Sequence, residues 1–425
     1  MGKTLIIVES PAKCKKIESF LGSQYKVIAS CGHFTKLNSL EQINFDNYTI
    51  KYKIDKTKIL KQMKDEISKA TEVIIGTDDD REGEAIGWAI CVFCNLDLKK
   101  TKKIVFQEIT KSALLKALDN TRPINMNIVK SQQARQILDI YLGYKISPEL
   151  WKYIQNKLSA GRCQTPALKL VLDNETEIKN QSLETHYKIT GNFTKYNIKF
   201  DGFKMIEKED INEFMNFMKK QEIWKIVETK ESTTTENPPI VFITSTLQQK
   251  AYNVLKMTPK MTMSYAQELY ENGLITYMRT DSACISKEFV NKMKDYITET
   301  YGSEYLHENI NSLTMNKNKN KAQEAHEGIR ICHLEKKEVN MKNSGSNRLY
   351  KLIYNNTLMC AMAKAKYDEK KYIINCNNDY KFIYNDKFCI FKGWKIVNES
   401  ENSINDFNYR SYLDKIVESN ISLQL

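Results

Sequence analysis

Residues 72–84 read Glu-Val-Ile-Ile-Gly-Thr-Asp-Asp-Asp-Arg-Glu-Gly-Glu, an apolar run followed by five acidic side chains within seven positions. The apolar run predicts a buried parallel strand. Asp78, Asp80 and Glu82 alternate where this strand turns into a helix, and carboxylates packed so closely raise one another's pKa unless a cation is present. A hard divalent ion with oxygen ligands, with Mg²⁺ as the best candidate, would relieve the repulsion. The alternative is a solvated acidic helix start, which the helix dipole favours.

A second strand-to-helix turn opens the chain. Residues 3–8 predict a strand, and residues 9–13 form its turn, in which Ser10 can cap the next helix and Pro11 suits the first helical position. Glu9 therefore lies at the carboxyl end of a strand, where open α/β sheets place their ligands. A purely structural capping turn would have much the same sequence.

The third segment of interest, residues 275–282, reads Ile-Thr-Tyr-Met-Arg-Thr-Asp-Ser. With a free pKa of about 10, the Tyr277 phenol is a poor nucleophile, so a nearby cation must favour its phenolate before it can attack. Arg279 could supply that cation, or it could clamp the phosphate under attack. For this segment alone, a surface tyrosine hydrogen-bonded to an arginine is the plainer interpretation.

Taken together, the three segments resemble the type IA DNA topoisomerases. In that family the TOPRIM fold supplies an IVESPAK-like opening and a DxDREGE segment, which stand here at residues 7–13 and 78–84. The ITYMRTDS-like segment of the family matches residues 275–282 without a gap. The opening looks like the bacterial topoisomerase I branch rather than topoisomerase III, and the sequence has no helicase-like GxxxxGK[ST] motif. Further matches follow in the same order, at residues 106–110, 132–139, 143–144, 147–148, 150–151, 158–166, 244–249 and 325–330.

The resemblance implies an enzyme that relaxes negatively supercoiled DNA. Tyr277 would attack a backbone phosphate of a single strand, giving a 5′-phosphotyrosyl bond and a free 3′-hydroxyl. Glu9 would serve as acid and base at the 3′-oxygen, and Lys13 and Arg279 would stabilise charge on the phosphoryl oxygens. His326, in the match to the family's AHExIR segment, would complete the catalytic set. Because the tyrosyl ester keeps the phosphodiester energy, such an isomerase needs no ATP.

The resemblance also implies a cofactor and a DNA path. Mg²⁺ would be held by Asp78, Asp80 and Glu82 and would serve mainly religation and turnover. Single-stranded segments of the duplex would follow a path through the first helical region and past the tyrosine. The residues expected to contact DNA along this path are Arg81, Arg135, Asp139, Tyr144, Arg162, Gln164 and Asp281.

The charge of the chain favours a polyanionic partner. Its 425 residues include 64 Lys and Arg against 52 Asp and Glu, a net charge of +12. The excess concentrates in residues 99–169, where fourteen Lys or Arg face four Asp or Glu. Aromatic side chains interleave with these cations, as a groove for single-stranded nucleic acid requires. An amphipathic helix with a solvated basic face is the alternative.

Cysteine usage and hydropathy predict an intracellular, soluble protein whose compartment the sequence leaves open. Ten cysteines occur without a disulfide framework, and no signal peptide or run of eighteen apolar residues is present. Cys91 and Cys94 form a single CxxC in an apolar, helix-like stretch. We interpret this pair as core packing rather than a zinc site.

The predicted fold class is multidomain α/β and α+β. Alternating strands and helices over residues 1–110 predict a parallel sheet with covering helices, and this part corresponds to the TOPRIM domain. Residues 111–182 predict helices, with starts at Ser112, Asn125 and Ser147. The resemblance implies a toroid built from a TOPRIM domain (1–110), a helical DNA-binding domain (111–182), a β-rich arch (183–245), a helical domain with Tyr277 (246–335) and a return to the arch (336–425).

The resemblance weakens at the end of the chain. The family continues past residues like 412–415 into a long helical return that completes the unit begun at 111–182, whereas this sequence stops at Leu425. The expectation is an incomplete toroid that exposes apolar surface, which a second polypeptide could complete. Two other classes stay open: a DNA-binding or partner-dependent subunit without relaxation activity, and a TOPRIM nuclease or primase. The latter leaves residues 244–330 unexplained.

Overall fold

The computed structural model describes residues 2–182, 186–193, 198–205, 208–220, 224–314, 327–375, 381–398 and 409–419. The chain divides into two compact units, and each is described by itself. The first comprises Met1–Ile178, Ile240–Val290 and Asn311–Thr357. The second comprises Lys179–Pro239, Asn291–Ile310 and Leu358–Leu425. In the part of the chain that the structure describes, no helix is long and apolar enough to span a lipid bilayer.

A parallel four-stranded sheet organises the start of the first unit, as the sequence predicts. Its order is β2-β1-β7-β8, with β1 at Thr4–Val8, β2 at Tyr25–Ala29, β7 at Glu72–Ile75 and β8 at Lys102–Lys103. The side chains from Leu5 to Val8 are at most 1% exposed, because β1 lies inside the sheet with both faces covered. Since all strands are parallel, the residues that follow β1 and β7 meet at one edge.

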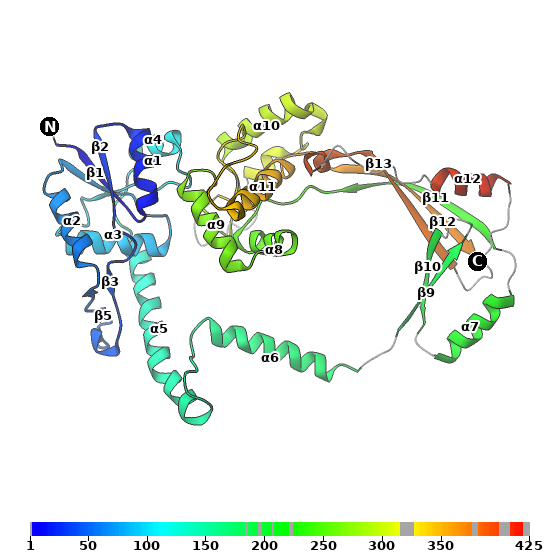
Figure 1. Cartoon of the computed structure of the whole chain (residues 1–425), viewed down its shortest axis with the longest axis horizontal. Helices are drawn as coiled ribbons and strands as arrows, with labels where there is room; N and C mark the ends of the chain where they lie inside the picture. The colour runs from blue at the N-terminus through cyan, green and yellow to red at the C-terminus, as the bar shows by residue number, and fades with distance from the viewer. Residues whose placement is uncertain are drawn as a thin grey trace. The chain divides into compact units, whose positions relative to one another are not determined.

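Three helices cover the sheet: α1 at Pro11–Leu21, α2 at Thr57–Ile67 and α3 at Arg81–Phe93 (Figure 1). Ser10 caps α1 by accepting a hydrogen bond from Ala12 N–H at 3.3 Å, and Pro11 occupies the first turn, as predicted. Cys91 is fully buried in the core between sheet and helices, and Cys94 packs against that core. The interpretation of this CxxC as core packing is confirmed.

Short strands between β2 and α2 form two hairpin-like pairs that the sequence did not reveal. They are β3 (Thr35–Lys36) with β6 (Lys53–Ile54), and β4 (Ile43–Asn44) with β5 (Thr49–Ile50), and a 3₁₀ turn at Leu40–Gln42 lies between β3 and β4. Aromatic contacts hold this region on α5: the Phe45 and Tyr141 rings lie 5.9 Å apart. Tyr52 also donates a hydrogen bond to Gln136 at 2.9 Å.

The predicted helical region consists of α4 (Lys111–Asp119), α5 (Met126–Tyr153) and α6 (Gln164–Asn180). Asn125 caps α5 as predicted, whereas α4 is capped by Thr110 rather than started by Ser112. The start predicted at Ser147 is wrong. This residue lies inside α5 with Pro148 after it, and its buried hydroxyl accepts a hydrogen bond from Ala160 N–H at 3.2 Å. Pro148 removes one main-chain hydrogen bond of α5, and tertiary packing stabilises the helix there by more than that loss.

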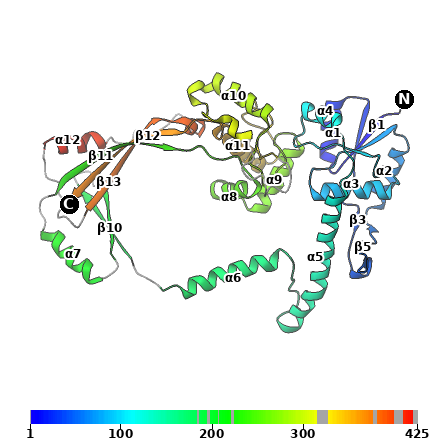
Figure 2. The same cartoon turned by 180° about the vertical axis from the view of Figure 1, so that it is seen from behind.

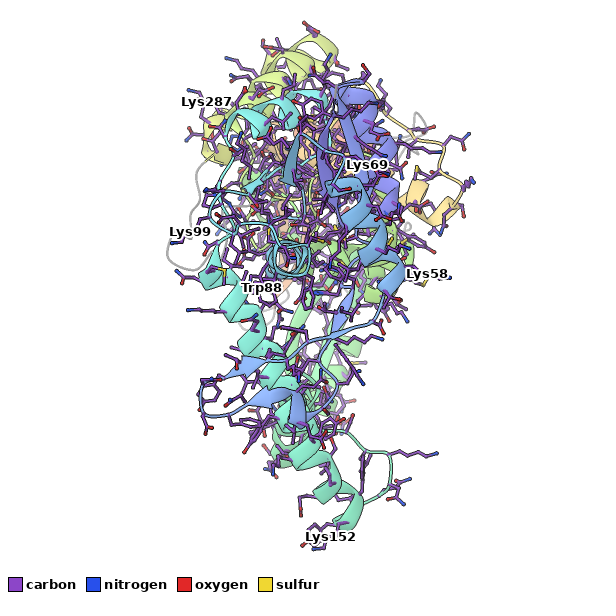
Figure 3. The ribbon with its side chains drawn as sticks, turned by 90° about the vertical axis from the view of Figure 1, so that its left-hand side faces the viewer. Lys58, Lys69, Trp88, Lys99, Lys152 and Lys287 are labelled. Atoms are coloured by element: carbon purple, nitrogen blue, oxygen red, sulfur yellow. The ribbon has the colours of Figure 1, made fainter. Side chains whose placement is uncertain are left out.

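Two features of these helices bear on function. Lys152, labelled in Figure 3, lies near the end of α5 that is farther from the sheet. Helix α6 leaves large apolar side chains in solvent. The four most exposed, at 60–71%, are Leu168, Leu170, Val171 and Leu172.

The rest of the first unit is mainly helical and surrounds the tyrosine segment. Helix α8 spans Thr244–Leu255, α9 spans Pro259–Glu271 and α11 spans Ser344–Met359. Helix α10 spans Lys287–Tyr301, and its residues from Asn291 onward belong to the second unit. Residues 272–286 connect α9 to α10 and carry Tyr277. Isolated bridges pair Ile275 with Ile331 and Phe242 with Ile329, so this segment is fixed by β-type pairing rather than by a helix.

The second unit contains a five-stranded antiparallel sheet of order β11-β12-β13-β10-β9. Its strands are β9 (Tyr187–Phe193), β10 (Ile198–Met205), β11 (Lys225–Glu236), β12 (Ala365–Asn375) and β13 (Lys381–Phe391). Figure 2 shows α7 (Lys208–Lys220) and α12 (Tyr409–Ser419) beside this sheet. Aromatic residues such as Phe193, Trp224 and Phe382 form the core. Strands from the predicted arch and from the predicted return to it thus share one sheet. Further 3₁₀ turns lie at Ser303–Tyr305, Ile310–Thr314 and Gly393–Asn398.

A buried ion-pair network ties the sheet to the start of α5. The Glu84 carboxylate, 1% exposed, contacts the fully buried Lys103 ammonium and accepts hydrogen bonds from Arg122 at 2.8 and 3.1 Å. It also accepts the Asn125 N–H at 2.5 Å. Lys103 in turn donates to the Asp78 carbonyl at 3.3 Å. Glu84, the last acid of the 78–84 segment, therefore belongs to a structural ion-pair network.

We expect Glu84→Gln to destabilise the first unit strongly. Removing this charge leaves the Lys103 ammonium buried without a carboxylate, a change that costs about 3–5 kcal/mol. Glu72→Gln is the matched control, since Glu72 pairs at 2.7 Å with Lys102, where both side chains are about half exposed, and such pairs contribute less than about 1 kcal/mol. Urea unfolding followed by tryptophan fluorescence checks this, and equal midpoints for the two variants would contradict it.

Candidate active site

Two acids meet at the edge of the parallel sheet where β1 and β7 end. Glu9 follows β1, Asp78 follows β7, and the Asp78 N–H donates a hydrogen bond to Glu9 Oε1 at 2.9 Å. A Cβ atom at Gly83 would lie 2.2 Å from the Asp78 carbonyl oxygen and 2.7 Å from Glu9 Oε1. Only glycine permits so close an approach of α3 to this edge. Glu9 lies at the carboxyl end of β1, as predicted, and tertiary structure brings it beside the acidic segment.

Lys13 neutralises Asp78 from within the protein. Its side chain is fully buried, and its ammonium forms an ion pair with Asp78 Oδ1. The same ammonium lies 4.9 Å from the centroid of the Tyr270 ring, a cation–π contact. Tyr270 completes the arrangement by donating its hydroxyl to Asp78 Oδ1 at 3.2 Å. Sequence analysis missed Tyr270, because an aromatic residue on an amphipathic helix predicts core packing.

Tyr277 contacts the third acid. Its side chain is 3% exposed, and its hydroxyl donates a hydrogen bond to Asp80 Oδ2. The other Asp80 oxygen caps α3 by accepting the Gly83 N–H at 2.7 Å. The Tyr277 ring packs edge to face on Tyr270, with centroids 5.2 Å apart. The nucleophile expected from the sequence is therefore held by a carboxylate that serves at the same time as a helix cap.

The electrostatics of Tyr277 differ from the sequence-based expectation. Burial raises the pKa of the Tyr277 phenol far above its ordinary value, and the charges of Asp80 and Asp78 raise it further. Arg279 lowers this pKa, as expected, and its Nη1 lies 3.5 Å from Asp80 Oδ2, but its effect is the smaller one. In this arrangement the phenol is protonated, so the cation alone does not produce a phenolate.

Main-chain hydrogen bonds fix the tyrosine segment on both sides. The Tyr277 N–H donates to the Gln107 carbonyl at 2.9 Å. On the other side, the Thr276 N–H donates to the Arg330 carbonyl at 2.9 Å, and the Thr276 hydroxyl donates to the Gly328 carbonyl at 2.8 Å. The segment lies between residues that follow β8 and residues that precede α11, so its position does not depend on side-chain contacts alone.

Glu9 has the electrostatics of a group that can exchange protons near neutral pH. Burial, together with the charge of Asp78, raises the pKa of Glu9 to about 7, although Lys13 acts in the opposite direction. A carboxyl group with this pKa is partly protonated at neutral pH, so it can both donate and accept a proton. Its position beside Tyr277 comes from tertiary structure, since the two residues lie on separate segments.

The predicted Mg²⁺ ligands do not all point to one place. Asp78 faces Lys13 and Asp80 faces Tyr277, but Glu82 turns toward His33 Nε2 at 2.9 Å and Gln132 Nε2 at 3.0 Å. Within the described residues, no three His, Cys, Asp or Glu side chains form a preassembled metal site. Glu9 is the acid that interacts with both aspartates, because each of them raises its pKa. Glu9, Asp78 and Asp80 are likewise oxygen donors of the kind that a hard divalent cation binds.

An open pocket of ≈ 540 Å³ adjoins these residues. Three guanidinium groups line it, those of Arg81, Arg135 and Arg279, and Asp281 lies beside them. Four of the residues expected to act on DNA are thus brought together. Ser245 and Gln248, at the start of α8, also line the pocket and were not singled out from the sequence, although they belong to the matched segment at 244–249. A second pocket of ≈ 340 Å³ is lined by Glu9, Asp78, Tyr277 and Arg279, among others.

The other expected DNA contacts lie elsewhere in the first unit. Arg162 and Asp139 form a two-point ion pair at 2.6 and 3.2 Å, and Gln164 donates to the Ser159 hydroxyl at 3.3 Å. Tyr144 donates to the Asn38 carbonyl at 2.6 Å while half of its side chain stays exposed. These residues lie on α5 and on the segment after it. His326 lies outside the described residues.

Comparisons with known proteins agree with this geometry. Residues 4–109 match the family model of the Toprim domain, and residues 123–418 match the DNA topoisomerase family model. The solved structure of full-length topoisomerase I from Thermotoga maritima, in a monoclinic crystal form, is similar at a TM-score of 0.79 with 34% sequence identity. The match covers 95% of this chain and 69% of that one.

The raised pKa of Glu9 predicts a pH-dependent loss of stability that Glu9→Gln removes. The folded pKa of about 7 exceeds the ordinary 4.5, so between these pH values the unfolded carboxyl ionises while the folded one keeps its proton. The wild-type protein should therefore lose stability from pH 4.5 upward, with the loss complete above pH 7. Urea midpoints from pH 4 to 8 in EDTA check this, and a difference between wild type and variant that is independent of pH would contradict it.

Proposed function

Since the chain belongs to the type IA DNA topoisomerase family, we propose that it relaxes negatively supercoiled DNA by cutting one strand, passing DNA through the break and resealing it. The observation that carries this proposal is the position of the Tyr277 hydroxyl. It donates a hydrogen bond to the Asp80 carboxylate, which lies beside Glu9, and arginine side chains line the adjoining pockets. A nucleophile, a proton-exchanging acid and cations for a phosphodiester are thus assembled in one place.

Cleavage follows from these contacts. The Tyr277 oxygen attacks a backbone phosphorus, its proton passes to Asp80, and the bond between phosphorus and the 3′-oxygen breaks. Glu9 in its protonated form donates a proton to that leaving oxygen, which becomes a 3′-hydroxyl. The product is a 5′-phosphotyrosyl ester. Religation is the reverse: Glu9 takes the proton from the 3′-hydroxyl, and Asp80 returns its proton to the tyrosine.

The cations have different parts in this proposal. Arg279 is 58% exposed at its side chain and lines both pockets, so it can stabilise negative charge on the phosphoryl oxygens. Arg81 and Arg135 line the larger pocket and would hold neighbouring phosphates. Lys13 is fully buried against Asp78, which favours a positioning role through that carboxylate over direct contact with DNA.

Glu9, Asp78 and Asp80 are the residues that would hold Mg²⁺. When bound, the ion would supply positive charge next to the phosphate and the 3′-hydroxyl. Lys13 already compensates Asp78 in the folded protein, and Tyr277 and Arg279 contact Asp80. A bound cation would share these carboxylates with those partners, while Glu82 remains hydrogen-bonded to His33 and Gln132.

The distal end of α5 fits a single strand. Trp151 is 47% exposed and Tyr153 is 71% exposed, and the Lys152 ammonium lies 4.8 Å from the Tyr153 ring centroid. Exposed aromatic rings next to cations suit stacked bases and a phosphate backbone. Strand passage further requires that the sheet with its acids and the segment with Tyr277 separate, each of them holding one end of the broken strand.

The first test is a covalent adduct. With 5′- and 3′-labelled single-stranded oligonucleotides and Mg²⁺, we expect a denaturant-resistant bond between protein and the 5′ side of the break. Tyr277→Phe should abolish it, because the nucleophilic oxygen is lost. Tyr252→Phe, at an exposed tyrosine on α8, is the matched control and should form adduct normally. An adduct that persists in Tyr277→Phe would refute the assignment.

Plasmid relaxation then separates the enzyme from the alternative subunit. Relaxation by this chain alone supports the proposed function. An adduct without relaxation would favour a partner-dependent subunit, for which the exposed apolar face of α6 is the supporting observation. DNA binding without an adduct would favour a non-catalytic binding protein.

Metal removal should separate cleavage from relaxation. In EDTA we expect the oligonucleotide adduct to persist and plasmid relaxation to stop, with recovery on addition of Mg²⁺. The revised ligand set predicts that Asp78→Asn weakens binding of Mn²⁺, used as a paramagnetic substitute for Mg²⁺, by about tenfold or more, whereas Glu82→Gln changes it little. Electron paramagnetic resonance measures the free ion, and the reverse ranking of the two variants would restore the originally predicted set.

A further inference from the structure

Arg330 is a buried cation that the proposed chemistry does not use. It is 2% exposed, and its guanidinium lies 3.9 Å from the Phe289 ring centroid. Two carboxylates flank it: Nη1 donates to Glu108 Oε2 at 2.9 Å, and Nε donates to Glu327 Oε2 at 2.8 Å. A cation as deeply buried as this is expected to be fully paired, and here it has two acids.

The two acids belong to different parts of the first unit. Glu108 lies between β8 and α4, and α4 packs on α1, so Glu108 belongs to the part that carries the sheet. Glu327 precedes Arg330 by three residues and belongs with the tyrosine segment. The Ile331 carbonyl at 3.0 Å and the Ser286 hydroxyl at 3.5 Å also accept hydrogen bonds from Arg330, and they lie on the tyrosine side as well. Among these side-chain partners of Arg330, Glu108 is the one from the sheet side.

The same residue holds the tyrosine segment by its main chain. The Arg330 N–H donates to the Thr276 hydroxyl at 3.0 Å, and its carbonyl accepts the Thr276 N–H at 2.9 Å. Tyr277, the next residue, donates its N–H to Gln107, which precedes Glu108. The contact between Arg330 and Glu108 therefore lies on the seam across which Tyr277 faces the acids of the sheet.

When this pair breaks, the buried Arg330 charge stays paired, and the partly exposed Glu108 keeps a hydrogen bond. Separation of the two sides would leave Arg330 bound to Glu327, and Glu108 would retain the hydrogen bond from the Thr110 hydroxyl at 3.1 Å. Breaking a buried ion pair is most costly when one partner is left buried without compensation. Here each partner keeps a second one on its own side, which suits repeated opening and closing.

We propose that Glu108 and Arg330 form a positioning ion pair that holds the Tyr277 segment on the acids of the sheet, and that Glu327 takes over the Arg330 charge when the segment moves away for strand passage. The proposal rests on the proposed function and deepens it. Glu108 stabilises the closed arrangement, in which cleavage and religation occur. Glu327 stabilises the open one, so two acids on one arginine set the balance between the two arrangements.

Two isosteric variants test this, because they should act in opposite directions. Glu108→Gln removes the acid that Arg330 loses on opening. Because a hydrogen bond to a charged group is then missing from the closed state, we expect the open state to last about tenfold longer. Glu327→Gln removes the acid that remains, so the open state should shorten by a similar factor. A purely structural role for the cluster would shift both variants in the same direction.

The measurement uses the full chain in magnetic tweezers, on DNA whose single-strand break is bridged by the covalently attached enzyme. Opening lengthens the tether, and the open lifetime is read directly at fixed force. Adduct formation on a single-stranded oligonucleotide, which needs no opening, shows that each variant is folded. Opposite shifts support the proposal. Equal lifetimes in all three proteins, or shifts in one direction, overturn the ion-pair role alone. Absence of any covalent bridge in the wild type overturns the proposed function and this inference with it.

Discussion

Repulsion among the acids at the edge of the parallel sheet is the constraint to which the rest of the site responds. Glu9, Asp78 and Asp80 lie close enough that both aspartates raise the pKa of Glu9. Folding such a cluster is unfavourable unless other groups compensate for it. Each carboxylate is compensated by its own neighbours. The three carboxyl groups are chemically alike but therefore differ in function.

Each acid has a different partner, and the partner determines what the acid can do. Asp78 faces a buried ammonium and the Tyr270 hydroxyl, so its negative charge is compensated within the protein. Asp80 caps α3 and receives the Tyr277 hydroxyl, which places it to accept the proton of the nucleophile. Glu9 receives a main-chain N–H but is otherwise desolvated, so it keeps a proton near neutral pH. Environment rather than residue type separates these roles.

The tyrosine side of the site is built on a similar rule. Tyr277 is buried and protonated, and main-chain hydrogen bonds to the Gln107 and Arg330 carbonyls fix its segment on both sides. Arg330 is buried as well, but it carries an acid from each side of the seam. Under the proposed function the site assembles for chemistry and comes apart for strand passage, which needs contacts that are specific and also reversible. An ion pair whose cation has a second acid on its own side meets both needs.

The sequence by itself determined the parallel sheet and the two strand-to-helix turns, because local patterns carry this information, and the family resemblance singled out Tyr277 and Glu9 as candidates. Apolar runs, a cap at Ser10 and a collinear set of motifs are all readable within short windows. Tertiary structure alone decided the partners. Tyr277 and Asp80 are 197 residues apart, and no spacing indicates that they touch. Glu82 turned away from the other acids because α3 begins at Arg81, where the alternation of a strand gives way to the rotation of a helix. Tyr270 had no local signal, and the matched segment at 325–330 did not reveal the partners of Arg330, since burial and partner choice depend on segments that only folding brings together.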